Sequence, residues 1–269
     1  MPKTLPEPRP EIANHPYAAR GVVVLATDTG TGKTAIGCAL TQTLHKQGRV
    51  VRVRKPVETG CVTDGSARIP ADATLLWAAA GKIESLETVC PLRFTTPVAA
   101  PQAAEIEGVH LQFARDIAPI LAPVLHDEGI TSSFWIIESA GGALSPLTDD
   151  TLNCELASFT KLPAILIAPD RLGTLSTLFA HIESLIQRCV PIAAIILNRH
   201  TGQSATERLQ PPDNLQALSD WLPRLWPEGS RVWQGKPPPV ISIGSGENPD
   251  AIGMKLVTAL NIETNRPSD

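Results

Sequence analysis

The sequence of 269 residues lacks several features that mark whole classes of protein. No apolar run approaches the ~18 residues of a membrane span, so we expect no membrane partner. The five cysteines are odd in number, scattered and without a C-x-x-C pair, which predicts free thiols in a reducing cytoplasm. The six histidines lack the spacing of metal ligands. The net charge of −4 gives no reason to expect nucleic acid as a partner.

The composition that is present is typical of a globular protein. Hydrophobic residues make up 43% of the chain and charged residues 19%, which predicts a soluble fold with a large core. The first 20 residues are rich in proline and contain no apolar block, so they predict a disordered tail and not a signal peptide. Residues 263–269 are interpreted as a flexible tail.

Apolar strands alternate with helical stretches between these tails. Strands are expected at 22–25, 49–54, 134–137, 163–168, 192–197 and 239–243. Helices are expected after residue 34, from Asp72, over 111–125 with interruptions at two prolines, over 173–188 and over 250–260. No linker and no repeat divides the chain. The pattern predicts a single three-layer α/β domain over residues 21–262, with a mainly parallel sheet.

The segment VVVLATDTGTGKT at 22–34 is the best-defined motif. A short strand leads into a glycine-bearing loop, and a helical pattern follows Gly32-Lys33-Thr34, which is the layout of a phosphate-binding loop. The strict pattern requires glycine where Thr27 stands. Loop N–H groups and the helix N-terminus would bind phosphates, with Lys33 on the outer phosphates and the Thr34 hydroxyl on Mg²⁺. The predicted nucleotide-binding residues of the loop are Thr29, Gly30, Thr31, Gly32, Lys33 and Thr34.

Charged residues stand where two other strands end. Lys55 follows strand 49–54 and precedes a proline, and Glu138 ends strand 134–137 before two glycines. In open parallel sheets these ends face the ligand, so Lys55 is a candidate ligand-binding residue and Glu138 a candidate holder of Mg²⁺ or a water. Asp72 at a helix start is either a cap or a metal ligand. Arg52 and Arg54 are interpreted as a solvated sheet edge.

Five segments in one order resemble the dethiobiotin synthetase family. They are ATDTGTGKT (26–34), KPVETG (55–60), Asp72 at a helix start, FTTPVAAPQAAEIEG (94–108) and ESAGGALSPL (138–147). The family loop, G-T-D-T-x-x-G-K-T, is one residue longer than the common form, which places its glycine at Ala26 and accounts for the failed strict match. An L-G-T segment at 172–174 and a strand-end Asn198 also fit, so the resemblance covers about residues 21–245.

The resemblance implies an activity and its partners. The family uses ATP and Mg²⁺ to insert CO₂, supplied as CO₂ or bicarbonate, between the two amines of 7,8-diaminononanoate. One amine becomes a carbamate, which attacks the γ-phosphate, and the second amine closes the ring and expels phosphate. The resemblance also implies a P-loop NTPase fold and a homodimer in which the substrate carboxylate docks on the neighbouring subunit.

The resemblance also assigns roles to residues of this chain. Lys33 and Lys55 would flank the γ-phosphate and the carbamate, and Thr29 and Thr59 would orient diamine and carbamate. The metal ligands would be Thr34, Asp72 and Glu138, and Asn198 would hydrogen-bond the adenine edge. The predicted catalytic set is therefore Lys33, Lys55 and Thr59. Further substrate-binding residues would be Gly141, Gly142, Gly173, Thr174 and Ser176.

Four departures from the family pattern leave alternatives open. Ala26 and Ser139 replace glycines, Gln102 follows the proline of the proline–alanine segment, and Ser176-Thr177 stands in place of Asn-His. A cobyric-acid-synthase-type enzyme would carry a long glutaminase domain, for which the chain ends too early. A partition-type or septum-site ATPase would carry a signature lysine early in the phosphate loop. Residues 27–31 of this chain, TDTGT, contain no lysine. A non-catalytic homologue is the third alternative.

Overall fold

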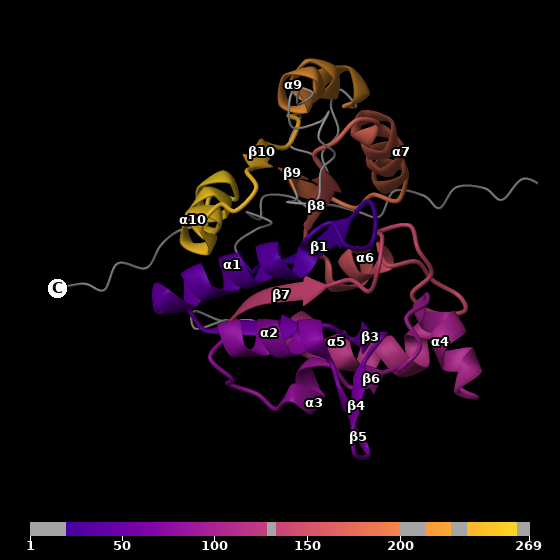
Figure 1. The fold of residues 1–269 in the computed structure, drawn as a ribbon. Helices are drawn as coiled ribbons and strands as arrows, with labels where there is room; N and C mark the ends of the chain where they lie inside the picture. The colour runs from indigo at the N-terminus through magenta and orange to yellow at the C-terminus, as the bar shows by residue number, and fades with distance from the viewer. Residues whose placement is uncertain (1–19, 128–132, 200–212, 227–235, 263–269) are drawn as a thin grey trace, which may run out of the picture.

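A computed structural model describes residues 20–127, 133–199, 213–226 and 236–262. These residues form one sheet of six strands in the order β10-β9-β8-β1-β7-β2, and every pairing in it is parallel (Figure 1). The strands are β1 (Gly21–Ala26), β2 (Val51–Arg54), β7 (Phe134–Glu138), β8 (Ala164–Pro169), β9 (Ile192–Asn198) and β10 (Val240–Ile243). The predicted parallel sheet is confirmed. The predicted tails, apart from Arg20, lie outside the described residues.

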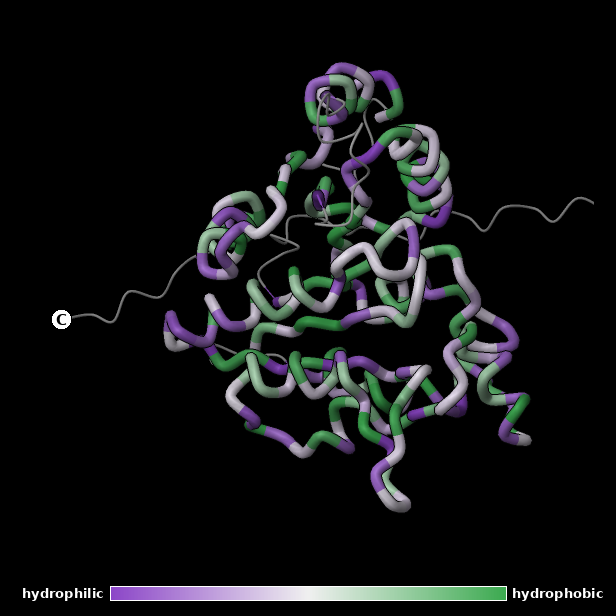
Figure 2. Tube along the Cα trace, viewed as in Figure 1, coloured by the Kyte–Doolittle hydropathy of each residue, from purple (hydrophilic) through white to green (hydrophobic). Residues whose placement is uncertain are grey.

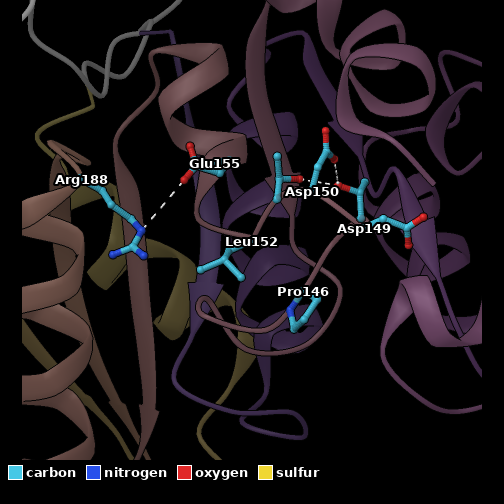
Figure 3. A pocket seen from close by; sticks show the side chains of 8 residues that line it. Pro146, Asp149, Asp150, Leu152, Glu155 and Arg188 are labelled. Atoms are coloured by element: carbon cyan, nitrogen blue, oxygen red, sulfur yellow. Dashed lines mark hydrogen bonds and ion pairs between the residues drawn. The ribbon is translucent and has the colours of Figure 1, made fainter. Parts of the chain in front are cut away.

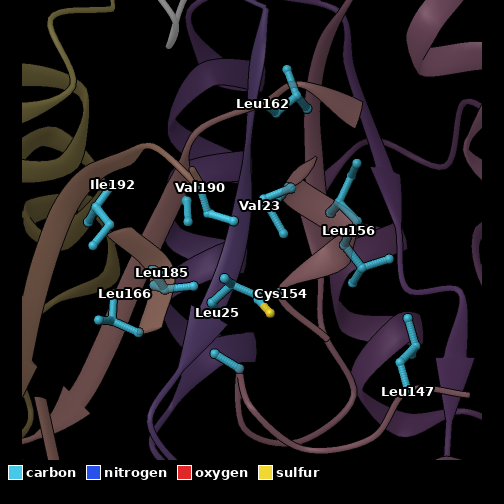
Figure 4. Close-up of a cluster of buried hydrophobic side chains, with 14 of the residues drawn as sticks. Val23, Leu25, Leu147, Cys154, Leu156, Leu162, Leu166, Leu185, Val190 and Ile192 are labelled. Atoms are coloured by element: carbon cyan, nitrogen blue, oxygen red, sulfur yellow. The ribbon is translucent and has the colours of Figure 1, made fainter. Parts of the chain in front are cut away.

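Helices cover both faces of this sheet because successive side chains of a strand point to opposite sides. Val22 and Val24 of β1 pack into one apolar cluster with helices α1 (Lys33–Lys46), α2 (Ala71–Ala79) and α10 (Pro249–Ala259). Val23 and Leu25 pack into a second cluster, part of which is drawn in Figure 4. Its helices are α5 (Ala118–His126), α6 (Glu155–Thr160), α7 (Thr174–Gln187) and α9 (Asn214–Leu225). Figure 2 shows green apolar residues along the strands between these layers. The three-layer prediction is confirmed.

Several short elements lie outside the predicted pattern. Strand β3 (Val57–Glu58) pairs with β6 (Leu92–Arg93), and an exposed hairpin of β4 (Val62–Asp64) and β5 (Ala67–Ile69) projects from the body in Figure 1. Helix α3 (Leu86–Val89) follows α2, and helix α4 (Ala100–Ile106) forms within the proline–alanine segment. A π-helical turn over Phe113–Ile117 precedes α5, so the expected 111–125 helix is interrupted just before Pro119, whereas Pro123 lies inside the continuous helix α5.

The prediction of a solvated edge for Arg54 is wrong. Strand β2 does lie at the edge of the sheet, but the Arg54 side chain is 2% exposed. Its guanidinium donates to both carboxylate oxygens of Glu84 at 2.9 Å and lies 5.0 Å from the centre of the Trp135 ring. Arg52 is more exposed and shares the Glu84 carboxylate at 3.0 Å. A planar, bidentate cation can therefore be buried on an aromatic ring where its charge is matched.

The close contact between α1 and α10 gives a test of the packing. A Cβ atom at Gly253 would lie 1.9 Å from the Thr43 hydroxyl and 2.5 Å from the Ala39 carbonyl oxygen. Since the Ala39 carbonyl belongs to the helix backbone, Gly253→Ala must separate the helices. We expect the free energy of unfolding, measured by urea denaturation, to fall by roughly 1–2 kcal/mol despite the better helix propensity of alanine. Thr258→Ala, at an exposed position of the same helix, should leave it nearly unchanged.

Candidate active site

The candidate site lies at the carboxyl ends of three neighbouring strands. Strand β7 is hydrogen-bonded to β1 on one side and β2 on the other, so the ends of all three meet at one edge of the sheet. Strand β1 leads into the phosphate loop, β2 into Lys55, and β7 ends at Glu138. The three segments are far apart in sequence. Parallel pairing therefore brings the predicted residues together.

The phosphate loop ends in a left-handed residue that starts helix α1. Gly32 is the residue before the helix and has φ 93°, a conformation that favours glycine. Lys33 is the first helical residue, is 7% exposed, and its ammonium donates to the Asp28 carbonyl at 3.2 Å. The Thr31 hydroxyl donates to the same carbonyl at 3.3 Å. The loop thus curls around its own lysine, with the first N–H groups of α1 beside it.

Lys55 lies among the three predicted metal ligands. Its ammonium is 2.5 Å from Glu138 Oε1 and 3.1 Å from Asp72 Oδ2. The Thr34 hydroxyl donates to the same Glu138 oxygen at 2.8 Å. Lys55 is 3% exposed and Glu138 is fully buried. The fold therefore joins Thr34, Lys55, Asp72 and Glu138 in one cluster, as the sequence predicts.

Burial and neighbouring charges act differently on the two lysines of the site. Burial lowers the pKa of Lys55, but the carboxylates of Glu138 and Asp72 outweigh it and hold the pKa above its usual value. For Lys33, burial lowers the pKa, Glu138 offsets only part of this effect, and the positive charge of Lys55 lowers it further. The two carboxylates therefore favour the charged form of Lys55, and a bound phosphate would favour the charged form of Lys33.

Glu58, at the end of β3, is a site residue that the sequence reasoning missed. Its two carboxylate oxygens accept from the backbone N–H groups of Asp72 at 3.0 Å and Ala73 at 2.9 Å. Burial raises the pKa of Glu58, although these two N–H groups and Lys55 lower it in part. Asp72 itself does not cap the helix, since its carboxylate turns to Lys55. A signal existed in Pro70, because a helix that starts after a proline needs a cap from elsewhere.

The two glycines after Glu138 lie against the phosphate loop. A Cβ atom at Gly142 would stand 3.3 Å from the Thr27 carbonyl oxygen, and one at Gly141 would stand 3.7 Å from the Thr29 hydroxyl. Thr59 follows Glu58 and is half-buried. A Cβ atom at its neighbour Gly60 would stand 3.2 Å from Pro97 Cβ, and the Phe94 N–H donates to the Glu58 carbonyl, so the KPVETG and proline–alanine segments lie side by side.

The remaining predicted residues lie at the ends of β8 and β9. Asn198 ends β9 and donates its amide to the Thr31 carbonyl at 2.8 Å, beside the phosphate loop. Gly173 precedes α7 with φ 87°, and Thr174 is buried while Ser176 is exposed. Strands β1 and β7 separate β8 from β2. The Gly173 segment is therefore set apart from Lys55 within one chain.

The structure shows how three of the four departures from the family pattern are accommodated. Ala26 ends β1 in register with Ile167, so its backbone has extended geometry and needs no glycine. The Ser139 hydroxyl is buried and donates to the Gly141 carbonyl at 3.3 Å. Gln102 is exposed on α4. These changes leave the cluster around Lys55 in place.

A hollow of about 350 Å³ lies elsewhere on the molecule, between the 146–155 segment and the end of α7. Two of its lining residues, Arg188 and Glu155, point toward one another in Figure 3, and their charged atoms lie 4.0 Å apart. Its lining residues are Pro146, Thr148, Asp149, Asp150, Thr151, Leu152, Glu155 and Arg188. They are distinct from the predicted site residues, so we do not assign the reaction to this hollow.

The oxygen set around Lys55 fits Mg²⁺. Within the described ranges, no group of three or more His, Cys, Asp and Glu side chains forms a closed metal cage. Mg²⁺ needs no such cage, because it takes one or two carboxylates and completes its shell with phosphate and water. Glu138 Oε2 is buried and accepts no hydrogen bond from the described part of the chain. A buried carboxylate oxygen without a donor is suited to a cation.

A parallel sheet whose first strand runs through a glycine-bearing loop into a helix that begins with Lys-Thr defines a P-loop nucleotide-binding protein. Comparison with known proteins narrows this class. A family model described as an AAA domain matches residues 20–224. Across the described residues, no helix has the length and apolarity to cross a membrane.

Three curated relatives are similar to this chain over most of their length. The chain is 37% identical over 180 residues to ATP-dependent dethiobiotin synthetase BioD of Anaeromyxobacter dehalogenans (strain 2CP-C), covering 67% of this chain and 77% of that protein. It is 36% identical to the enzyme of that name from Rhodopirellula baltica, with coverages of 74% and 78%. For Caulobacter vibrioides (strain NA1000 / CB15N) the identity is 34%, with coverages of 74% and 85%. The chain belongs to the ATP-dependent dethiobiotin synthetase family, and the predicted family is confirmed.

Proposed function

We propose that the protein is a cytoplasmic ATP-dependent cyclo-ligase that converts 7,8-diaminononanoate and CO₂ into dethiobiotin, a step of biotin biosynthesis. Family membership supports this activity. The observation that carries it is the position of Lys55, whose buried ammonium lies 2.5 Å from Glu138 beside the phosphate loop. A reaction that moves a phosphoryl group onto a carbamate needs positive charge at that place.

The first steps use the phosphate loop and the two lysines. Backbone N–H groups of the loop and of the first turn of α1 bind the phosphates of ATP, and Lys33 meets the outer ones. One amine of the substrate adds to CO₂ and loses a proton, which gives a carbamate. Thr29 and Thr59 orient this group, and Lys55 offsets its negative charge. Holding the carbamate oxygen in line with the γ-phosphorus is the main contribution of these side chains.

Each of the two later steps forms one bond and breaks another. An oxygen–phosphorus bond forms from the carbamate to the γ-phosphorus while the bond to the β–γ bridging oxygen breaks and ADP leaves. The second amine then attacks the carbamoyl carbon, so that a carbon–nitrogen bond forms, the carbon–oxygen bond breaks and phosphate leaves. A proton is lost from that amine. Gly141 and Gly142 would bind the substrate through backbone that lies close to the phosphate loop, since a Cβ atom at Gly142 would stand 3.3 Å from the Thr27 carbonyl oxygen.

Thr34, Asp72 and Glu138 would hold Mg²⁺ through one hydroxyl and two carboxylates. When bound there, Mg²⁺ would offset negative charge during phosphoryl transfer. Asn198 stands at the edge of the phosphate loop and would hydrogen-bond the adenine. Its amide already contacts the Thr31 carbonyl, which fixes its side chain next to the nucleotide site.

The proposal includes a homodimer in which the carboxylate of the substrate docks on the neighbouring subunit. The docking segment is 172–176, where a glycine with positive φ opens the 14-residue helix α7. The Thr174 N–H donates to the Arg171 carbonyl at 3.2 Å, and the N–H groups that follow it in the first turn of such a helix attract a carboxylate by roughly 0.3–2 kcal/mol. These donors belong to the backbone, so the segment can act with serine in place of the family's asparagine. Its separation from Lys55 within one chain supports a site shared by two chains.

A mixture of two defective variants tests this arrangement. Ser176→Asp places a negative charge at a helix start, which the helix tolerates but the substrate carboxylate does not. We expect Ser176→Asp and Lys55→Gln each to be weakly active alone. An equal mixture of the two variants, once they have exchanged subunits, should regain about a quarter of wild-type turnover. Ser176→Ala, which adds no charge, is the matched control and should stay active. No gain on mixing, or a fully active monomer in size-exclusion chromatography, contradicts the shared site.

The activity is tested by ATP turnover with each partner omitted in turn. The proposed ligase hydrolyses ATP steadily only when 7,8-diaminononanoate and bicarbonate are both present. A non-catalytic homologue would bind ATP without turnover. A partition-type ATPase would turn over without the diamine. Either result rejects the proposed function.

A further inference from the structure

Glu58 stands between two predicted catalytic residues in the sequence but contacts the site through the backbone of α2. We infer that Glu58 is a positioning residue, which caps α2 from a distance and thereby holds the Asp72 carboxylate at the metal and phosphate site. This inference rests on the proposed function.

Helix α2 has no cap of its own. The residue before it is Pro70, whose ring offers no hydrogen-bond acceptor to the N–H groups of the first turn. Glu58 takes that place from 14 positions earlier in the chain, with its two oxygens on the N–H groups of Asp72 and Ala73. Glu58 is 6% exposed, so water competes little for these hydrogen bonds.

Glu58 is itself held by strand pairing. Its carbonyl accepts from the Phe94 N–H at 2.9 Å, and β3 pairs with β6 in register Val57–Leu92 and Glu58–Arg93. The Glu58 carboxylate is therefore held in position between the KPVETG segment and α2. Glu58 therefore links the short strand that follows Lys55 to the start of α2.

The position of the Asp72 carboxylate depends on the cap that Glu58 supplies. The Asp72 side chain is 48% exposed, and among the described residues it pairs only with the ammonium of Lys55, at 3.1 Å. Where its carboxylate lies is decided mainly by the backbone of the first turn, which Glu58 holds. Without this cap, the first turn would fray and the Asp72 oxygens would spread over several positions. Mg²⁺, which demands near-ideal geometry, would then bind less tightly.

The test combines a loss with a local rescue. Glu58→Gln keeps the size but only one acceptor oxygen, and Glu58→Ala keeps none. We expect the Mg²⁺ concentration for half-maximal turnover to rise about fivefold or more in Glu58→Gln, and further in Glu58→Ala. Pro70 has the extended backbone of a helix-capping residue, with φ −81° and ψ 105°. Pro70→Ser should therefore cap the same N–H groups locally and bring the midpoint of Glu58→Ala back to within about threefold of wild type.

A second readout avoids turnover. Calorimetric titration of Mg²⁺ into protein saturated with a non-hydrolysable ATP analogue should show the same order of affinities. Asn248→Ala removes a cap from α10, where the side chain accepts from the Asp250 N–H at 2.8 Å. It is the matched control, and should lower the melting temperature without moving the Mg²⁺ midpoint.

The outcomes separate the two claims. Wild-type protein without diamine-dependent turnover rejects the proposed function. Active wild-type protein with an unchanged Mg²⁺ midpoint in Glu58→Gln rejects the positioning role alone. A shifted midpoint that Pro70→Ser fails to restore shows that Glu58 acts by its charge and not through the helix, which also overturns the inference.

Discussion

Lys55→Gln is expected to lower the turnover number on the order of 10²-fold or more, because it removes positive charge from the transferring phosphoryl group. The side chain lies 2.5 Å from Glu138 and 3.1 Å from Asp72, so its loss has a second effect. It leaves the fully buried Glu138 carboxylate without its ion-pair partner, and we expect the free energy of unfolding without Mg²⁺ to fall by roughly 3–5 kcal/mol. Steady-state kinetics and urea denaturation measure the two effects.

Lys46→Gln is the matched control for this variant. Lys46 pairs with Asp250 at 2.6 Å, but both side chains are more than half exposed. Exposed pairs contribute about 0–1 kcal/mol, so neither turnover nor stability should change much. Near-full activity of Lys55→Gln with an unchanged KM would remove Lys55 from the site.

Glu138→Gln is expected to raise the Mg²⁺ concentration for half-maximal turnover roughly tenfold or more, since even residues one contact removed from a metal cost about 10–100-fold in affinity. The variant keeps the shape of the side chain but loses the charge that faces Lys55 and the Thr34 hydroxyl. Titration of turnover against Mg²⁺ at saturating ATP gives the midpoint.

Glu84→Gln controls for the loss of a partly buried carboxylate. Glu84 accepts both hydrogen bonds of the Arg54 fork, and among the described residues its charged partners are Arg52 and Arg54, which lie outside the phosphate loop. We expect the free energy of unfolding of Glu84→Gln to fall while its Mg²⁺ midpoint stays within about twofold of wild type. If Glu138→Gln also leaves the midpoint unchanged, Glu138 is only a structural partner of Lys55.

The sheet and much of the site could be predicted because each depends on local sequence. Buried parallel strands are short apolar runs, and β7, β8 and β9 stand out for this reason. In such a sheet, charged residues just after a strand face the ligand. Lys55 and Glu138 were therefore identifiable from position alone, and the structure places them in contact.

The parts that could not be predicted depend on partners distant in sequence. Arg54 is buried only because Glu84 and Trp135 meet it, and neither contact is visible in an alternating strand pattern. Glu58 reads as a loop residue until the start of α2 is placed beside it. Helix α9, which lies outside the predicted pattern, is apolar on one side and buries Leu218 and Leu222 against the core.

The most direct measurement of the proposed reaction follows carbon-13-labelled bicarbonate into the product. Purified protein is incubated with ATP, Mg²⁺, 7,8-diaminononanoate and the labelled bicarbonate. The products are then separated, and their masses are measured by mass spectrometry. The proposed ligase gives dethiobiotin with the label in its ring carbonyl, and forms ADP in equal amount. Lys55→Gln run in parallel should give little of either. ADP without labelled dethiobiotin, or equal product from wild type and Lys55→Gln, would contradict the assignment of the reaction to this site.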